Sequence, residues 1–92
     1  PFLGFYCAMT RRTMNGNVVG PEQAISFAEA LRLYTANGAY ASFEETAKGT
    51  IEPGKLADLV IVESDLGRAT PEQVKEAKIL RTIIGGQVVY QR

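Results

Sequence analysis

Residues 48–63 read K-G-T-I-E-P-G-K-L-A-D-L-V-I-V-E and constrain the fold more than any other stretch. Gly49 and Gly54 can take a positive φ without steric cost, and Pro53 fixes φ beside the second glycine, so two tight turns with a short strand between them are predicted. The aliphatic run at 59–62 is typical of a β-strand that is buried on both faces. The stretch holds no nucleophile, general base or metal cluster, so it predicts scaffold.

A capping box predicts a helix upstream of this stretch. Ser26 is followed three residues later by Glu29, and each side chain can bond the backbone amide of the other residue. The pattern predicts a helix over residues 27–36, and Asn37-Gly38 is a stop signal. The alanine-rich residues that follow favour one more helical turn.

Three further segments complete the prediction of local structure. Residues 1–12 have apolar side chains spaced as on one helical face, and the Asn- and Gly-rich residues 13–21 are a loop by composition. A second cap at Thr70, with Pro71 next and Gln73 as its box partner, predicts a short helix that ends near residue 77.

The carboxyl end carries a hairpin signal. Two β-prone runs, 79–84 and 87–91, are separated by Gly85-Gly86, and a type I′ turn needs a positive φ at both central residues. The chain is therefore expected to be helical up to about residue 47 and mainly β after it, with about four short strands. A sheet of that size needs a covering partner.

Composition excludes several classes of function. The formal net charge is zero, which gives no support for nucleic acid or an anionic membrane as partner. No apolar run is long enough to span a membrane, and no signal peptide is visible. The location is unknown, with the cytoplasm only as a default, because the amino terminus of the expected parent is not among these residues. The chain has no histidine and a single cysteine, Cys7, which excludes Ser-His and Cys-His catalysis and a thiolate zinc site within these residues.

Several motifs together resemble the carboxy-terminal end of metal-dependent amidohydrolases. The resemblance rests on G-T-I-E-P-G-K-L-A-D-L-V-I-V at 49–62, on R-T-I-I-G-G-Q-V-V-Y at 81–90, and on the helix A-I-S-F-A-E-A-L-R-L-Y-T-A-N-G-A-Y-A at 24–41. The opening F-L-G-F-Y-C-A-M-T-R-R at 2–12 is similar to the family 3 subgroup in particular. Taken together, the resemblance covers essentially the whole chain, but it does not identify a substrate.

The resemblance implies an α+β fragment of a larger enzyme. Residues 1–47 would be the terminal loop and last helices of a (β/α)₈ barrel, and residues 48–92 the carboxy-terminal strands of a composite β-sandwich. The first residue, Pro1, is not Met, which also suggests that an amino-terminal portion precedes it. The partners expected are therefore the remainder of the parent chain and a small-molecule amide.

The implied chemistry is hydrolysis of a non-peptide C–N bond in an amide or cyclic amide. A divalent metal, with zinc as the first expectation, would activate a water molecule in the intact enzyme. The family's metal-ligating histidines, lysine and aspartate match no position in this sequence, so no catalytic or metal residue is assigned and the fragment alone is expected to be inactive.

One pair of residues is a candidate for substrate binding. Loops that follow barrel strands lie on the catalytic face, so Arg11 and Arg12 would border the active site and can bind an anionic group of a substrate. The alternative, which we favour, is a solvated pair at a helix end. For Asp58 we favour a structural carboxylate that accepts backbone amides at the start of a strand, and for Cys7 a small buried apolar residue.

A second hypothesis belongs to a different class. The chain would be a free-standing, non-catalytic α+β interaction module that hides its strand edges by forming a homo-oligomer. Absence of histidine and balanced charge fit this hypothesis equally well. Pro1 and the incomplete sheet favour the enzyme fragment.

Overall fold

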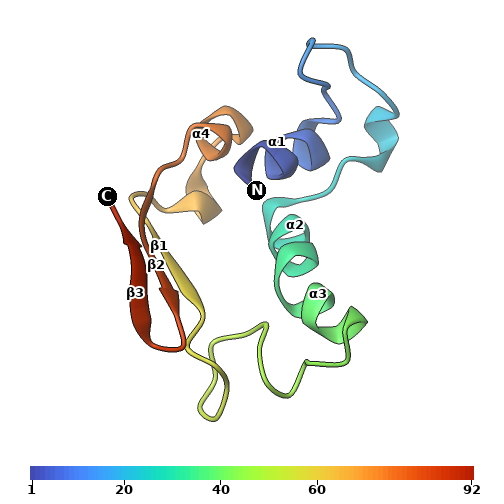
Figure 1. The fold of residues 1–92 in the computed structure, drawn as a ribbon. Helices are drawn as coiled ribbons and strands as arrows, with labels where there is room; N and C mark the ends of the chain where they lie inside the picture. Colours follow the sequence, from blue (N-terminus) through green and yellow to red (C-terminus); the bar gives the residue numbers. More distant parts are fainter. The chain divides into compact units, whose positions relative to one another are not determined.

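The computed structural model describes residues 1–92 as an α+β chain with a three-stranded antiparallel sheet (Figure 1). No helix has the length and apolar character that a membrane span requires. The elements in chain order are α1 (Phe2–Thr10), η1 (Pro21–Gln23), α2 (Phe27–Tyr34), α3 (Ala36–Ala41), β1 (Leu59–Val62), η2 (Leu66–Arg68), α4 (Pro71–Lys75), β2 (Ile79–Ile84) and β3 (Gln87–Gln91).

The chain divides into two compact units, each built from two segments. The first unit holds Pro1–Leu31 and Asp65–Ala77, and the second holds Arg32–Ser64 and Lys78–Arg92. The chain crosses from the first unit to the second inside α2.

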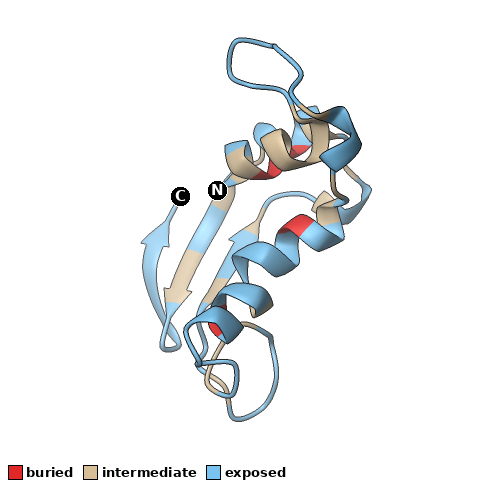
Figure 2. Cartoon of the chain, turned by 90° about the vertical axis from the view of Figure 1, so that its right-hand side faces the viewer, coloured by how far each residue is buried: buried red, intermediate tan, exposed pale blue.

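The first unit has a small core where α1, α2 and α4 meet. Phe5, Ala30 and Val74 are buried there, one from each helix. The Phe5 ring packs edge-on against Phe2, with ring centroids 5.9 Å apart, and lies 5.7 Å from the ring of Phe27. Figure 2 shows that the buried residues of the chain are confined to helices.

Both predicted capping boxes are confirmed. The Glu29 amide donates to the Ser26 hydroxyl (3.2 Å), and the Ser26 amide donates to the Glu29 carboxylate (3.1 Å). These bonds from Ser26 lower the pKa of the Glu29 carboxyl, because they favour its charged form. The same reciprocal pair joins Thr70 and Gln73 at the start of α4.

The predicted end of the second helix is wrong. α2 ends at Tyr34, and Asn37-Gly38 lies inside α3 and does not stop a helix. Thr35 breaks the helix with φ −128° and ψ −91°, and a new helix begins directly after it. Asn37 and Gly38 are the second and third residues of α3 and so lie in its first turn. The further helical turn predicted for this region is confirmed by α3.

Residues 44–58 form turns, and the short strand predicted between the two glycines is absent. Gly49 (φ 108°) and Gly54 (φ 90°) do adopt the predicted positive φ. The backbone between them bonds locally or to nearby turns, as when the Lys55 amide donates to the Glu52 carbonyl (3.2 Å). No strand lies alongside to pair with it, so the sheet has three strands and not four.

The sheet has the order β1-β2-β3, with Leu59 opposite Ile83 and Ile83 opposite Val88. The predicted Gly-Gly hairpin is confirmed, with φ 57° at Gly85 and 82° at Gly86.

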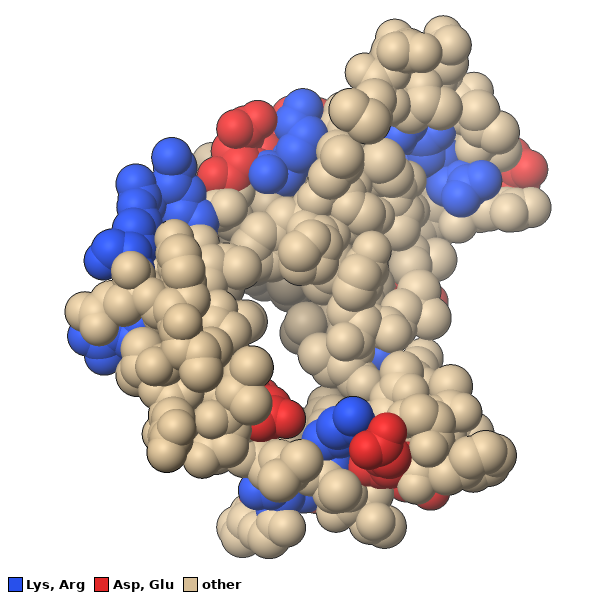
Figure 3. Space-filling model, viewed as in Figure 1, with Lys and Arg blue, Asp and Glu red and all other residues tan.

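The predicted burial of the aliphatic strand on both faces is wrong for these residues. β1 is an edge strand, Val60 is 55% exposed, and no residue of the sheet is buried (Figure 2). In its own unit the sheet is a single layer, so its apolar side chains meet no second layer. Figure 3 shows that most of the surface over the sheet in this view is uncharged.

Gly49 lies directly against α3, where a side chain does not fit. A Cβ built on Gly49 would lie 2.8 Å from the Cβ of Ala39 and 3.3 Å from the Thr35 carbonyl oxygen. Ala39 is buried and the carbonyl is backbone, so neither can move aside cheaply. Gly54 also has a positive φ, but nothing lies within 4 Å of its Cβ position.

This difference predicts unequal effects of two Gly→Ala substitutions. Gly54→Ala adds only the strain of a positive φ, about 1 kcal/mol, whereas Gly49→Ala adds overpacking and is expected to cost roughly 2–4 kcal/mol. Urea unfolding of the full-length protein measures both. Equal shifts of the two midpoints would contradict the close approach of Gly49 to α3.

Candidate functional site

The loop that carries the two candidate arginines is closed by backbone bonds. Arg11 follows the last residue of α1 and caps the helix: it takes the left-handed conformation (φ 60°, ψ 22°) and donates its amide to the Cys7 carbonyl (2.7 Å). The Val19 amide donates to the Arg11 carbonyl (2.9 Å), and Arg12 pairs with Val18 in an antiparallel bridge. Residues 11–19 therefore form a tight, hairpin-like loop.

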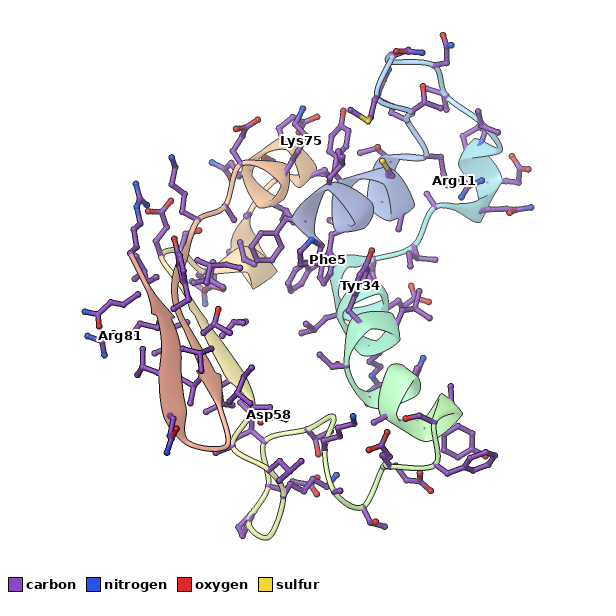
Figure 4. All side chains as sticks on the ribbon, viewed as in Figure 1. Phe5, Arg11, Tyr34, Asp58, Lys75 and Arg81 are labelled. Atoms are coloured by element: carbon purple, nitrogen blue, oxygen red, sulfur yellow. The ribbon has the colours of Figure 1, made fainter.

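Both arginine side chains brace this loop. The Arg11 Nε donates to the Val19 carbonyl (2.9 Å), and the Arg12 Nη1 donates to the Gly16 carbonyl (3.2 Å). Arg11 is partly buried and Arg12 is exposed; Figure 4 labels Arg11 beside the loop. A guanidinium has five N–H groups, so each side chain keeps donors for an external anion after these bonds.

Neither sequence interpretation of the arginines included this bracing role. The acceptors of both side chains are backbone carbonyls. Every residue has such a carbonyl, so the sequence alone does not reveal which residues accept these bonds. The Asn- and Gly-rich composition of residues 13–20 signalled a loop but not its closure onto α1.

Asp58 acts in the second unit as the structural carboxylate that the sequence predicts. It lies just before β1 (Figure 4). Its Oδ1 accepts the Gly85 amide of the hairpin turn at 2.9 Å. The neighbouring Gly86 amide donates to the Ala57 carbonyl (3.0 Å). The amides of Gly85 and Gly86 in the β2–β3 turn thus donate to the two residues directly before β1.

Neither Cys7, the remaining candidate, nor the adjacent carboxylates Glu44 and Glu45 belong to a cluster that could hold a metal ion. Cys7 is a free thiol on α1 and is partly buried. Glu44 forms an ion pair with Lys48 (3.3 Å), and the Ser42 hydroxyl followed by Lys48 lowers the pKa of its carboxyl. Glu45 is exposed beside it. No three His, Cys, Asp or Glu side chains gather in a group that could hold a metal ion.

A cation–π contact joins two helices of the first unit and was not predicted. The Lys75 ammonium lies 4.6 Å from the centre of the Tyr6 ring, which connects α4 to α1 beside the Phe5 core. The two residues are far apart in sequence, so no local pattern signals the contact.

Comparison with known proteins identifies the family. The model of the amidohydrolase family matches residues 1–90. The chain belongs to the amidohydrolase family. This confirms the resemblance found in the sequence and favours the enzyme fragment over the free-standing module.

Relatives and a solved structure agree with the family match. The chain is 37% identical over 87 residues to an N-substituted formamide deformylase of Arthrobacter pascens and 30% identical over 95 residues to the putative amidohydrolase YtcJ of Bacillus subtilis. An amidohydrolase from Thermotoga maritima superposes with a TM-score of 0.63 at 30% identity, over 77% of this chain and 17% of that one.

The chain corresponds to a small part of these proteins. The matches cover 95% of this chain but 16% of the deformylase, and 100% of this chain but 18% of YtcJ. The chain therefore spans less than a fifth of the length of these two relatives.

The contact between Asp58 and Gly85 predicts a long-range effect of one substitution. Asp58→Ala removes the acceptor of the Gly85 amide and is expected to cost about 1–2 kcal/mol and to speed hydrogen exchange at Gly85. Asp58→Asn keeps an acceptor oxygen and is expected to cost less.

Asp65→Ala is the matched control. Asp65 accepts an amide only two residues away, from Gly67 (3.1 Å), so its loss should leave exchange at Gly85 unchanged. Unchanged exchange at Gly85 in Asp58→Ala would contradict the role assigned to Asp58.

Proposed function

We propose that the protein containing these residues is a metal-dependent hydrolase that cleaves a non-peptide C–N bond of an amide or cyclic amide. The observation that carries this proposal is the family match over residues 1–90 together with 37% identity to a protein named as an N-substituted formamide deformylase. The substrate class follows from the names of the relatives and from the implied chemistry of the family.

The residues of this chain do not fit a metal site. They include no histidine, and no three acidic or thiol side chains lie together. We therefore assign the divalent metal, with zinc as the first candidate, to residues elsewhere in the protein. The 92 residues alone are proposed to be inactive.

The proposed role of these residues is structural, in two parts. Residues 1–47 would supply the terminal loop and last helices of a (β/α)₈ barrel, and residues 48–92 would supply strands of a small β-sandwich. The sheet supports the second part, because its strands carry exposed aliphatic side chains that a second layer would cover. β1 and β3 are the edge strands of the sheet. We further propose that copies of the protein associate through these edges.

Activity of the complete gene product tests the proposed reaction. We expect it to hydrolyse the amide C–N bond of at least one of an N-alkyl formamide, an N-acyl amino acid and a cyclic amide, with ring opening in the last case. A strong chelator should abolish turnover, and added zinc should restore it.

The 92-residue chain is the control and should give no turnover. Turnover that persists after complete removal of metal would contradict metal dependence. Absence of turnover on all three substrates in metal-loaded protein would contradict the proposed substrate class.

We also propose that Arg11 and Arg12 border the active site and bind an anionic group of the substrate. Their guanidinium groups retain free donors beyond the loop bonds, and guanidinium binds carboxylate in a bidentate way. Arg12 is exposed, so Arg12→Gln is the gentler change for the fold.

Arg12→Gln is expected to raise KM by roughly 10- to 150-fold for an amide that bears a carboxylate, since a charge-assisted bond contributes ~1.5–3 kcal/mol. KM for the uncharged analogue should not change. Arg32→Gln, on an exposed arginine of α2, is the matched control. An equal rise for charged and uncharged substrates would assign Arg12 to loop structure alone.

A further inference from the structure

The chain contains two exposed Asn-Gly pairs whose backbones differ. Asn15-Gly16 lies at the tip of the loop after α1, and Asn37-Gly38 lies inside α3. All four residues are exposed. We propose that Asn15 is a site of spontaneous deamidation in the folded protein and that Asn37 is protected.

The reaction at Asn15 needs only water. The Gly16 backbone nitrogen attacks the Asn15 side-chain carbonyl carbon, the C–N bond of the side-chain amide breaks, and ammonia leaves. Water then opens the five-membered succinimide at either carbonyl and gives aspartate or isoaspartate. The net change is one water consumed and one ammonia released. Glycine suits the attack because it has no Cβ to crowd its nitrogen.

The loop is closed at its base, and at its tip an exposed turn bond holds the attacking nitrogen. The Gly16 amide donates to the Thr13 carbonyl (3.0 Å) in an exposed turn, and the Gly16 carbonyl accepts the Arg12 Nη1 (3.2 Å). Gly16 has φ 86°, and nothing lies within 4 Å of its Cβ position, so neighbouring atoms do not oppose rotation. Exposed backbone bonds in loops open at low free-energy cost.

The helix imposes the opposite condition on Asn37. Ring closure requires the next nitrogen to reach the side-chain carbonyl carbon, and helical ψ near −42° holds the two apart. α3 must open locally before Gly38 can attack, although both residues are exposed. Backbone conformation, and not accessibility, therefore distinguishes the two pairs.

The product changes the loop that the arginines brace. Aspartate places a carboxylate next to Gly16, whose carbonyl accepts the Arg12 Nη1 (3.2 Å). Isoaspartate also adds a methylene to the main chain, which displaces the bond from the Thr13 amide to the Asn17 carbonyl (2.8 Å). The inference does not depend on the proposed enzymatic activity, since the reaction is intrinsic to the chain.

Peptide mass mapping of the aged, full-length protein tests the proposal. Native protein is held in mildly alkaline buffer and sampled over time, in parallel with protein unfolded in urea. Trypsin cleavage after Arg12, Arg32 and Lys48 places the two Asn-Gly pairs in separate peptides. The zero-time sample corrects for deamidation during digestion. Asn17, which is followed by the β-branched Val18, is an internal control within the first peptide.

In native protein we expect Asn15 to deamidate at least about tenfold faster than Asn37, the factor that corresponds to ~1.4 kcal/mol for opening α3. In urea the two rates should be similar. Asn15→Gln should remove the modification from the first peptide. Asn15 that stays intact in native protein while it converts in urea would overturn the proposal, as would equal native rates at Asn15 and Asn37.

Discussion

The register of the sheet depends on a hydrogen bond between residues far apart in the chain. Asp58 accepts the Gly85 amide at 2.9 Å, directly before β1 begins. The strand that follows is aliphatic at every position, so its own pattern does not favour one face over the other. The carboxylate and the Ala57 carbonyl, which accepts the Gly86 amide, fix β1 against the hairpin from one end.

The two units are stabilised in different ways. The first unit buries Phe5, Ala30 and Val74 against one another. The sheet has paired backbone groups but no buried side chain, and Val60 and Val89 are each more than half exposed. Backbone pairing without burial gives a single-layer sheet little stability in water. This contrast supports the proposal that the sheet completes its core with other parts of an amidohydrolase.

The loop after α1 shows how one side chain can serve structure and remain available for binding. Arg11 and Arg12 each donate one hydrogen bond to a loop carbonyl, which orients the guanidinium group. A guanidinium has five N–H groups, so most donors remain available. A braced loop presents its side chains with a small entropy loss on binding. The closure also places Asn15 at the tip of the loop. There the turn bond from the Gly16 amide to the Thr13 carbonyl must open before the proposed deamidation.

The sequence by itself determined the features that act within a few residues, namely both capping boxes and the Gly85-Gly86 hairpin, because donor and acceptor are neighbours in the chain. It also carried the family resemblance. Only the tertiary structure decided that Thr35 divides the predicted helix, that no strand forms after Gly49, and that Asp58 bonds a distant turn. These outcomes depend on backbone groups, which any residue provides, and on their positions in space, which local sequence does not encode.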